Sequence, residues 1–138
     1  MQKVKAIIFP VILACLVFTG CQKENSVTPS SDARAAFTGN WGVQETWVKL
    51  SYEVTISADT SSKMGVLIYN FADIGFSYHP AKALVSGNSI TLDPNQLIGD
   101  GLIANGSGTL SVSSVIHWNY TINDGATLRQ VSSTFTKL

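Results

Sequence analysis

Cysteine is almost absent from this sequence. Its two cysteines, Cys15 and Cys21, both lie in the first 21 residues, so residues 22–138 contain none. This distribution excludes disulfide bonds and thiolate metal sites from all of the chain after residue 21. A fold built from that part must be held together by its hydrophobic core.

An excess of charge of either sign is also missing. The chain carries nine basic and nine acidic side chains, and no cluster of Lys and Arg interrupts it. Without Lys3 and Lys5, which precede the first apolar segment, seven basic and nine acidic side chains remain. Because nucleic acid binding needs clustered Lys and Arg, we expect no nucleic acid partner.

Signatures of catalysis and of cofactor binding are missing as well. The sequence has no serine hydrolase, zinc peptidase or P-loop motif, and His79 and His117 have no nucleophile or carboxylate at a fixed spacing. Asp93, Asn95 and Asp100 offer oxygen ligands, but their spacing is typical of turns and not of a calcium loop. We therefore expect no enzyme activity, no cofactor and no metal.

The one long hydrophobic run is too short to cross a membrane. Met1–Lys5 contain two lysines, and about 13 apolar residues follow within 6–19, whereas a spanning helix needs about 20. Such a run, with the small residues Thr19 and Gly20 at its end, indicates a signal peptide over residues 1–20. The order resembles bacterial lipoprotein signals, which are cut before a cysteine, here Cys21. The alternative is an ordinary secretory signal with a chance cysteine.

The lipoprotein resemblance implies that Cys21 is the lipid attachment site and carries acyl chains such as palmitate. Several acyl chains on one residue give stable membrane binding, since each buried CH₂ contributes about 0.8 kcal/mol. The pentapeptide "CQKEN" also resembles a signal for the outer face of the outer membrane in some Gram-negative phyla. A merely polar linker is the alternative there. We expect a lipid-anchored outer-membrane protein, on the periplasmic face or the cell surface.

The domain organisation follows from where apolar residues resume. Residues 22–36 have no aromatic and one branched aliphatic, Val27, too little apolar surface to fold. We therefore interpret residues 21–36 as a lipidated flexible tether. Residues 37–138 are long enough for one compact domain, which we expect to be a monomer.

Alternation of apolar and polar residues dominates the chain after residue 36 and predicts an all-β domain. Eight alternating segments predict strands near 37–48, 52–59, 64–71, 81–85, 90–93, 103–112, 116–122 and 127–137. Eight short antiparallel strands most readily close into an up-and-down barrel, which removes exposed sheet edges. A two-sheet β-sandwich is the fallback.

The first of these segments, "FTGNWGVQETW", resembles the glycine and tryptophan signature of lipocalins and other calycins, carried here by Gly39 and Trp41. Small bacterial lipocalin-like lipoproteins are the nearest group. The resemblance implies that a cation of the last strand packs across Trp41, and Arg129 and Lys137 are the candidates. If the first and last strands are antiparallel neighbours, Trp41 should meet Lys137, and Arg129 should lie near Trp47 and Lys49.

Glu45 is the one charged residue that the alternation places on the inner face of the first strand. An unpaired buried carboxylate would be costly. A shifted register could bring Glu45 to Arg129, the carboxylate could line a polar cavity or mouth, or a local bulge could turn it to solvent.

Two functions from different classes fit these observations. In the first, the barrel binds a small apolar or sugar ligand, and the candidate ligand-binding residues are Glu45, Trp47, Tyr52, Trp118, Tyr120 and Arg129. In the second, a solid barrel acts as a protein-interaction or inhibitor lipoprotein. The segment "NGSGTLSVSS" at 105–114 resembles the inhibitory strand of bacterial lysozyme inhibitors. An internal cavity would favour the first function, and a solid core with a protruding apolar loop near 70–80 would favour the second.

Overall fold

The alternating segments form antiparallel strands that close on themselves. The computed structural model describes residues 32–46, 48–112 and 114–138, so Cys21, the signal segment and most of the tether lie outside the described residues. The strands are β1 (Gly39–Glu45), β2 (Ser51–Ala58), β3 (Gly65–Tyr69), β4 (Ala81–Ser86), β5 (Ser89–Leu92), β6 (Gln96–Ile98), β7 (Leu102–Val112), β8 (Val115–Asn123) and β9 (Leu128–Lys137).

The sheet is an eight-stranded barrel with one short extra strand. Its strand order is β5-β4-β3-β2-β1-β9-β8-β7-β6, and an additional β5–β7 pairing closes the circle. The three residues of β6 pair with β7 beside this closure. The predicted barrel is thus confirmed, and the sandwich is not adopted. The predicted strand set lacked β6, which is too short to show alternation.

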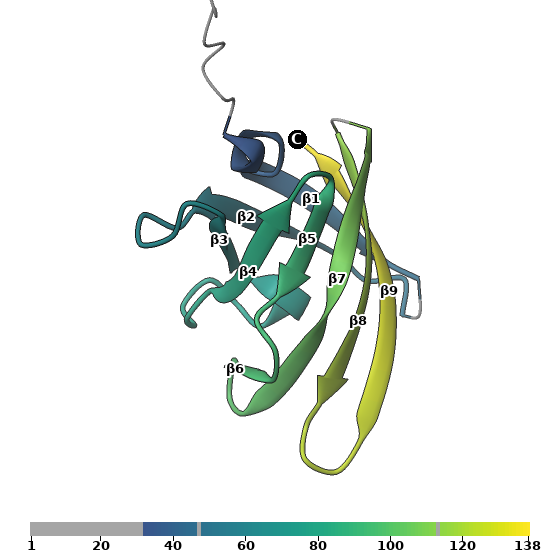
Figure 1. The fold of residues 1–138 in the computed structure, drawn as a ribbon. Coiled ribbons are helices and arrows are strands. Elements are labelled where there is room, and N and C mark those ends of the chain that lie inside the picture. Colours follow the sequence, from purple (N-terminus) through teal and green to yellow (C-terminus); the bar gives the residue numbers. More distant parts are fainter. Residues whose placement is uncertain (1–31, 47, 113) are drawn as a thin grey trace, which may run out of the picture. The chain divides into compact units, whose positions relative to one another are not determined.

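Strand direction defines two ends of the barrel (Figure 1). The short helix η1 (Ala33–Ala36) and the C-terminus lie at the end where β1 begins, which we call the proximal end. The β8–β9 hairpin and β6 lie at the opposite, distal end. Glu45 is the last residue of β1, so it lies at the end of this strand that is farther from the proximal end. Its side chain is buried inside the barrel.

The proximal end is closed by Trp41 and Lys137. Trp41 is fully buried, and its indole Nε1 donates to the carbonyl of Phe37 at 2.8 Å. Trp41 pairs with Lys137 across β1 and β9, and Lys137 Nζ lies 5.3 Å from the indole centroid. The same Nζ donates to the carbonyl of Ala36 at 3.3 Å. This confirms the contact between Trp41 and Lys137 that strand pairing predicts.

The residues just before β1 are part of the folded structure. Arg34 in η1 forms an ion pair with Asp32 and donates from Nη1 to the carbonyls of Asp59 and Ser62, at 2.9 and 2.7 Å. A longer contact of 3.4 Å reaches the carbonyl of Gly65. We expected residues 21–36 to be a flexible tether, whereas 33–36 form a helical turn that holds the β2–β3 turn. The composition of this segment does not predict that Arg34 makes specific hydrogen bonds to the β2–β3 turn.

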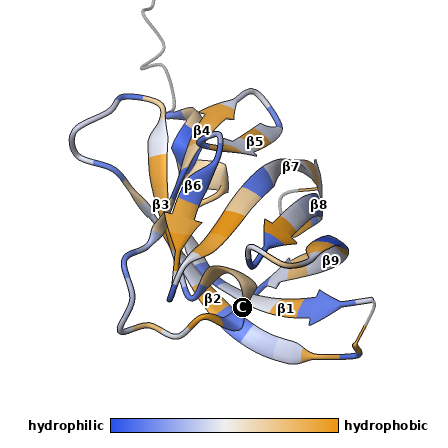
Figure 2. Cartoon of the chain, turned by 90° about the horizontal axis from the view of Figure 1, so that it is seen from below, coloured by the Kyte–Doolittle hydropathy of each residue, from blue (hydrophilic) through white to orange (hydrophobic). Residues whose placement is uncertain are grey.

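The interior is filled by aliphatic side chains around a few large aromatic ones. Hydrophobic and hydrophilic residues alternate along the strands when the barrel is seen from its distal end (Figure 2). The largest buried side chains are Trp41, Trp118, Tyr120, Phe37, Phe71 and Phe135. Gly106 and Gly108 of β7 lie opposite Tyr120 and Trp118, and a Cβ at either glycine would lie within 2.9 Å of those aromatic residues. These glycines of β7 therefore allow close approach of β8.

A strained turn delivers Phe71 to this core. The predicted third strand ran to Phe71, but β3 ends at Tyr69 and the chain enters the turn η2 (Phe71–Asp73). Asn70, Ala72 and Asp73 have left-handed backbones, with φ of 60°, 57° and 57°. Alternation cannot reveal such a reversal. No helix of the described ranges is both long and apolar enough to cross a membrane.

Candidate ligand site

A buried carboxylate with two phenol partners lies inside the barrel. Glu45 is 9% exposed, and its Oε1 accepts hydrogen bonds from the hydroxyls of Tyr120 at 2.6 Å and Tyr52 at 2.9 Å. β1 pairs with β9 so that Glu45 lies opposite Ser133, the register expected without any shift. Glu45 therefore occupies a polar site inside the barrel. The alternative in which a local bulge turns it to solvent is not adopted.

Burial keeps the two phenols of this cluster protonated. It raises the pKa of Tyr52 far above its ordinary value, and the neighbouring Tyr120 and Glu45 add to the effect. The pKa of Tyr120 is raised by burial and then by its hydrogen bond to Glu45. Both phenols therefore stay protonated at neutral pH and act as hydrogen-bond donors to the carboxylate.

Two more polar side-chain atoms of the same layer are buried. Ser133 lies between Glu45 on β1 and Trp118 on β8 in the strand register. Trp118 Nε1 has no hydrogen-bond partner among the described residues. Ser133 Oγ makes no hydrogen bond of good geometry there, although it approaches the Tyr120 hydroxyl closely enough to oppose the rise in the pKa of that phenol. Both can donate; Ser133 adjoins Glu45 in the strand register, and Trp118 lies one strand further.

Phe71 covers this layer. Its ring centroid lies 4.8 Å from that of Tyr120, 5.4 Å from that of Trp118 and 6.5 Å from that of Phe135. Trp118 and Tyr120, which we expected to form the walls of a ligand site, are therefore core residues in contact with Phe71. Asn70 holds the turn in place, because its Nδ2 donates to the carbonyl of Glu53 and its Oδ1 accepts from the N–H of Gly75.

The structure does not bring all expected residues together. Glu45, Tyr52 and Tyr120 are hydrogen bonded, and Trp118 lies in the adjacent register position. Arg129 is exposed near the β8–β9 hairpin, four positions beyond the partner of Glu45, and the only ion pair of the described residues is that of Asp32 with Arg34. The shifted register that would join Arg129 to Glu45 is not adopted. Trp47 lies outside the described residues.

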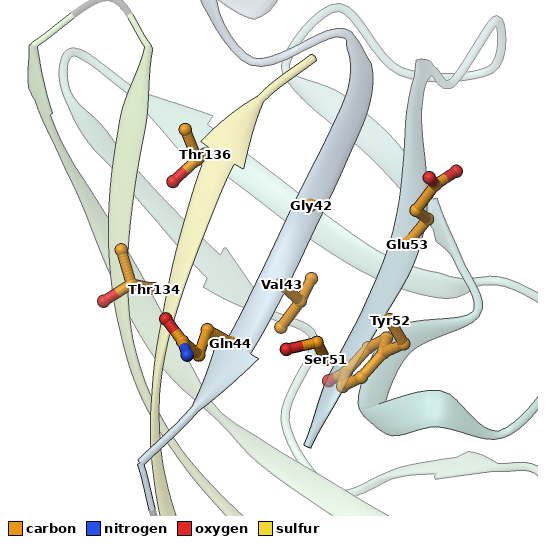
Figure 3. A pocket seen from close by; sticks show the side chains of 8 residues that line it. All are labelled: Gly42, Val43, Gln44, Ser51, Tyr52, Glu53, Thr134 and Thr136. Atoms are coloured by element: carbon orange, nitrogen blue, oxygen red, sulfur yellow. The ribbon is translucent and has the colours of Figure 1, made fainter. Parts of the chain in front are cut away.

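A hollow lies on the outer face of β9, β1 and β2 (Figure 3). This outer groove has a volume of about 520 Å³ and is lined by Gly42, Val43, Gln44, Ser51, Tyr52, Glu53, Thr134 and Thr136. An adjoining hollow of about 340 Å³, the rim hollow, is lined by Gln44, Glu45, Thr46, Lys49 and Thr134. Glu45 thus contacts both the interior tyrosines and the rim hollow.

Sequence reasoning missed Ser133, Phe71 and the outer groove. Ser133 shares the inner face of β9 with Val131 and Phe135, and a serine between two buried apolar residues is a usable signal. Phe71 was assigned to a strand. The outward residues of β9, β1 and β2 could have been grouped from the predicted strand pairing. Within the described part of the chain, no three His, Cys, Asp or Glu side chains are placed to hold a metal ion.

Comparisons with known proteins identify the fold but no family. No protein-family profile and no curated protein matches this sequence. The structure of EF1p2_mFAP2b bound to DFHBI is similar with a TM-score of 0.50 and 15% identity, over 78% of this chain and 98% of that one. The redesigned beta barrel b11L5F_LGL has a TM-score of 0.51 and 14% identity, over 78% and 96%. Membership of a lipocalin-like family stays a prediction.

Proposed function

We propose that this chain is a lipid-anchored binding protein whose barrel takes a small planar ligand that carries a hydrogen-bonding oxygen. The observation that carries the proposal is the buried Trp118 indole N–H without a partner, with the Ser133 hydroxyl between it and Glu45 in the strand register. Buried donors in native proteins nearly always have a partner. An oxygen atom on the ligand would accept from both donors, and a ligand hydroxyl could donate to the Glu45 carboxylate.

Phe71 is the side chain that such a ligand would replace. Its ring already lies against Trp118 and Tyr120, but a phenyl ring offers a buried N–H only a weak acceptor. Phe71 also sits between left-handed Asn70 and Ala72, and an alanine with this backbone is strained. If Phe71 withdraws, a ligand ring would fill the space.

The test compares phenol with toluene, two rings of similar size of which only phenol has an oxygen. The protein is labelled with 15N-tryptophan, and the indole N–H resonances are followed by NMR. Phenol at millimolar concentration should shift the Trp118 resonance and bind more tightly than toluene. The Trp41 resonance should stay in place, because its N–H already donates to the Phe37 carbonyl.

Variants identify the signal and the donors. Trp118→Phe assigns the resonance, and Ser133→Ala should reduce the preference for phenol over toluene. Equal binding of the two probes would indicate a merely apolar space, and an unmoved Trp118 resonance would leave the ring site without support. Either result would remove the proposed ligand class.

The lipid anchor is tested separately at Cys21. The signal-like residues 1–20 and the cysteine after them support an acylated N-terminus. Cys21→Ser should release the protein from membranes or leave it uncleaved. A processed Cys21→Ser chain that still sediments with membranes would contradict the anchor.

A protein-interaction role is the second candidate, favoured by the loop that follows η2. Phe76 is 56% exposed and Tyr78 is 36% exposed, and Tyr78 donates to Asp100 at 2.6 Å, which fixes the loop. Exposed aromatic residues are typical of binding surfaces. If the chain inhibits lysozyme, Phe76→Ser should abolish inhibition, whereas Leu84→Ser, at an equally exposed position on β4, should not.

A further inference from the structure

The outer groove lies over Gly42, a residue of β1 that has no side chain. Gly42 lies between Glu53 of β2 and Thr136 of β9 in the strand register, and all three positions point outward. Its backbone is not left-handed, and a Cβ there would meet Leu138 Cδ2 at 3.4 Å and the Thr136 carbonyl at 3.8 Å, which are ordinary contacts. Neither conformation nor crowding therefore requires glycine at this central strand position. A gap for a ligand is a use that glycine in a strand can serve.

The groups around this gap are polar and available. The next outward row along the strands is Thr134, Gln44 and Ser51. Within the described ranges, no side-chain hydrogen bond joins Gln44, Ser51, Glu53, Thr134 or Thr136 to the protein. Hydroxyl, amide and carboxylate groups thus surround the glycine on three neighbouring strands (Figure 3).

Tyr52 lies at the edge of the groove, but its side chain turns inward, because its hydroxyl donates to the interior Glu45 at 2.9 Å. The outward side chains that β2 contributes to the groove are therefore those of Ser51 and Glu53. The adjoining rim hollow contributes Lys49 and Glu45, one cation and one anion. With Glu53 as the only charged residue of the groove itself, the surface offers hydrogen bonds of both kinds and little net charge.

We propose that the outer groove is a binding site for a neutral polyhydroxylated ligand, such as a disaccharide. Each sugar hydroxyl both donates and accepts, so it can pair with the Gln44 amide, the threonine hydroxyls and the Glu53 carboxylate. The missing side chain at Gly42 lets a sugar ring approach the backbone of β1, and the exposed Leu138 side chain beside the glycine offers an apolar contact. This site is separate from the interior one and does not depend on it.

The test uses the full chain and three neutral disaccharides: maltose, cellobiose and N,N′-diacetylchitobiose. Backbone amide resonances are followed by 15N NMR during each titration. At least one sugar should shift the amides of Gly42, Gln44 and Thr134, and the Trp118 indole resonance should not move. Gly42→Val fills the gap and should weaken binding at least tenfold. Ser107→Val, which adds the same side chain at an exposed position of β7, should bind as the unchanged protein does.

Three outcomes would overturn the proposal. These are the absence of groove shifts with all three sugars, unchanged binding by folded Gly42→Val, and amide shifts confined to other strands. Analytical sedimentation compares the self-association of the unchanged protein with that of Gly42→Val. If Gly42→Val changes self-association and not sugar binding, the groove is an interface between two copies of this chain.

Discussion

Tyr120 and Tyr78 each donate a 2.6 Å hydrogen bond to a carboxylate, but only the bond of Tyr120 is buried. Tyr120→Phe leaves Glu45 with one donor in the interior, so it should lower the free energy of unfolding by about 1.5–3 kcal/mol. Tyr78→Phe removes an exposed bond and should have a small effect. Urea denaturation of the two variants measures the difference. Equal losses would show that burial does not strengthen the interior bond.

The raised tyrosine pKa values make stability depend on alkaline pH. Below pH 10 both phenols are protonated in the folded and the unfolded chain. Above it the unfolded chain releases protons at the ordinary tyrosine pKa of about 10, whereas folded Tyr52 and Tyr120 keep theirs. The free energy of unfolding should then fall by about 1.4 kcal/mol per pH unit for each tyrosine.

Urea denaturation between about pH 9 and 11.5 follows this loss. Tyr52→Phe and Tyr120→Phe should each flatten the alkaline slope, and the double variant should remove most of it. A slope that is unchanged in the double variant would assign the alkaline loss to other groups.

Trp41 and Lys137 contact each other, but they should contribute very unequally to the free energy of unfolding. Trp41 is fully buried, and truncation of a buried tryptophan typically costs about 3–5 kcal/mol, so Trp41→Ala should unfold or severely destabilise the barrel. Lys137→Ala loses the cation above the ring, which typically contributes about 0.5–1 kcal/mol at an exposed site. Thermal denaturation ranks the two. A loss from Lys137→Ala as large as that from Trp41→Ala would contradict this account of the proximal end.

Individual residues could be predicted where strand parity or pairing fixes them. The inward position of Glu45 follows from alternation along β1, and the contact of Trp41 with Lys137 follows from antiparallel pairing of the first and last strands. The partners of Glu45 could not be predicted. Tyr120 is 75 residues away in sequence, and its height in the barrel depends on the stagger of all strands.

At the scale of elements, η1 should contribute to stability although it precedes the barrel. Arg34→Ala removes the hydrogen bonds to the Asp59 and Ser62 carbonyls and should lower the melting temperature measurably. A chain that starts at Ala35 should melt below one that starts at Gln22 for the same reason.

Lys63→Ala is the matched control, because Lys63 is exposed in the same β2–β3 turn. It should melt like the unchanged protein. If Arg34→Ala and Lys63→Ala melt alike, the turn does not need η1.

A strand could be predicted from the sequence when it was long enough to show clear alternation of apolar and polar residues. Long alternating strands such as β8 and β9 were located to within about one residue, because each inward residue is buried and each outward one is solvated. η2 and β6 were not predicted, because each has only three residues and is too short to show a periodic pattern. Gln96 shows the extra information that is needed. Its amide both donates to and accepts from the backbone of Lys82 at 2.7 Å, and this tertiary contact fixes β6 beside β4.

The whole molecule is a ring of strands whose first and last members are neighbours. Trp41 pairs with Lys137 and Val43 with Phe135, so contacts that close the barrel join residues almost a hundred positions apart in the chain. During synthesis β1 has no partner on this side until the final strand has been made. The growing chain is thus an open sheet with an unpaired edge, which is prone to aggregate. Closure over such a sequence distance is also intrinsically slow. A chain that crosses a membrane before it folds would complete its barrel only when its last residues arrive, so export and closure would end together.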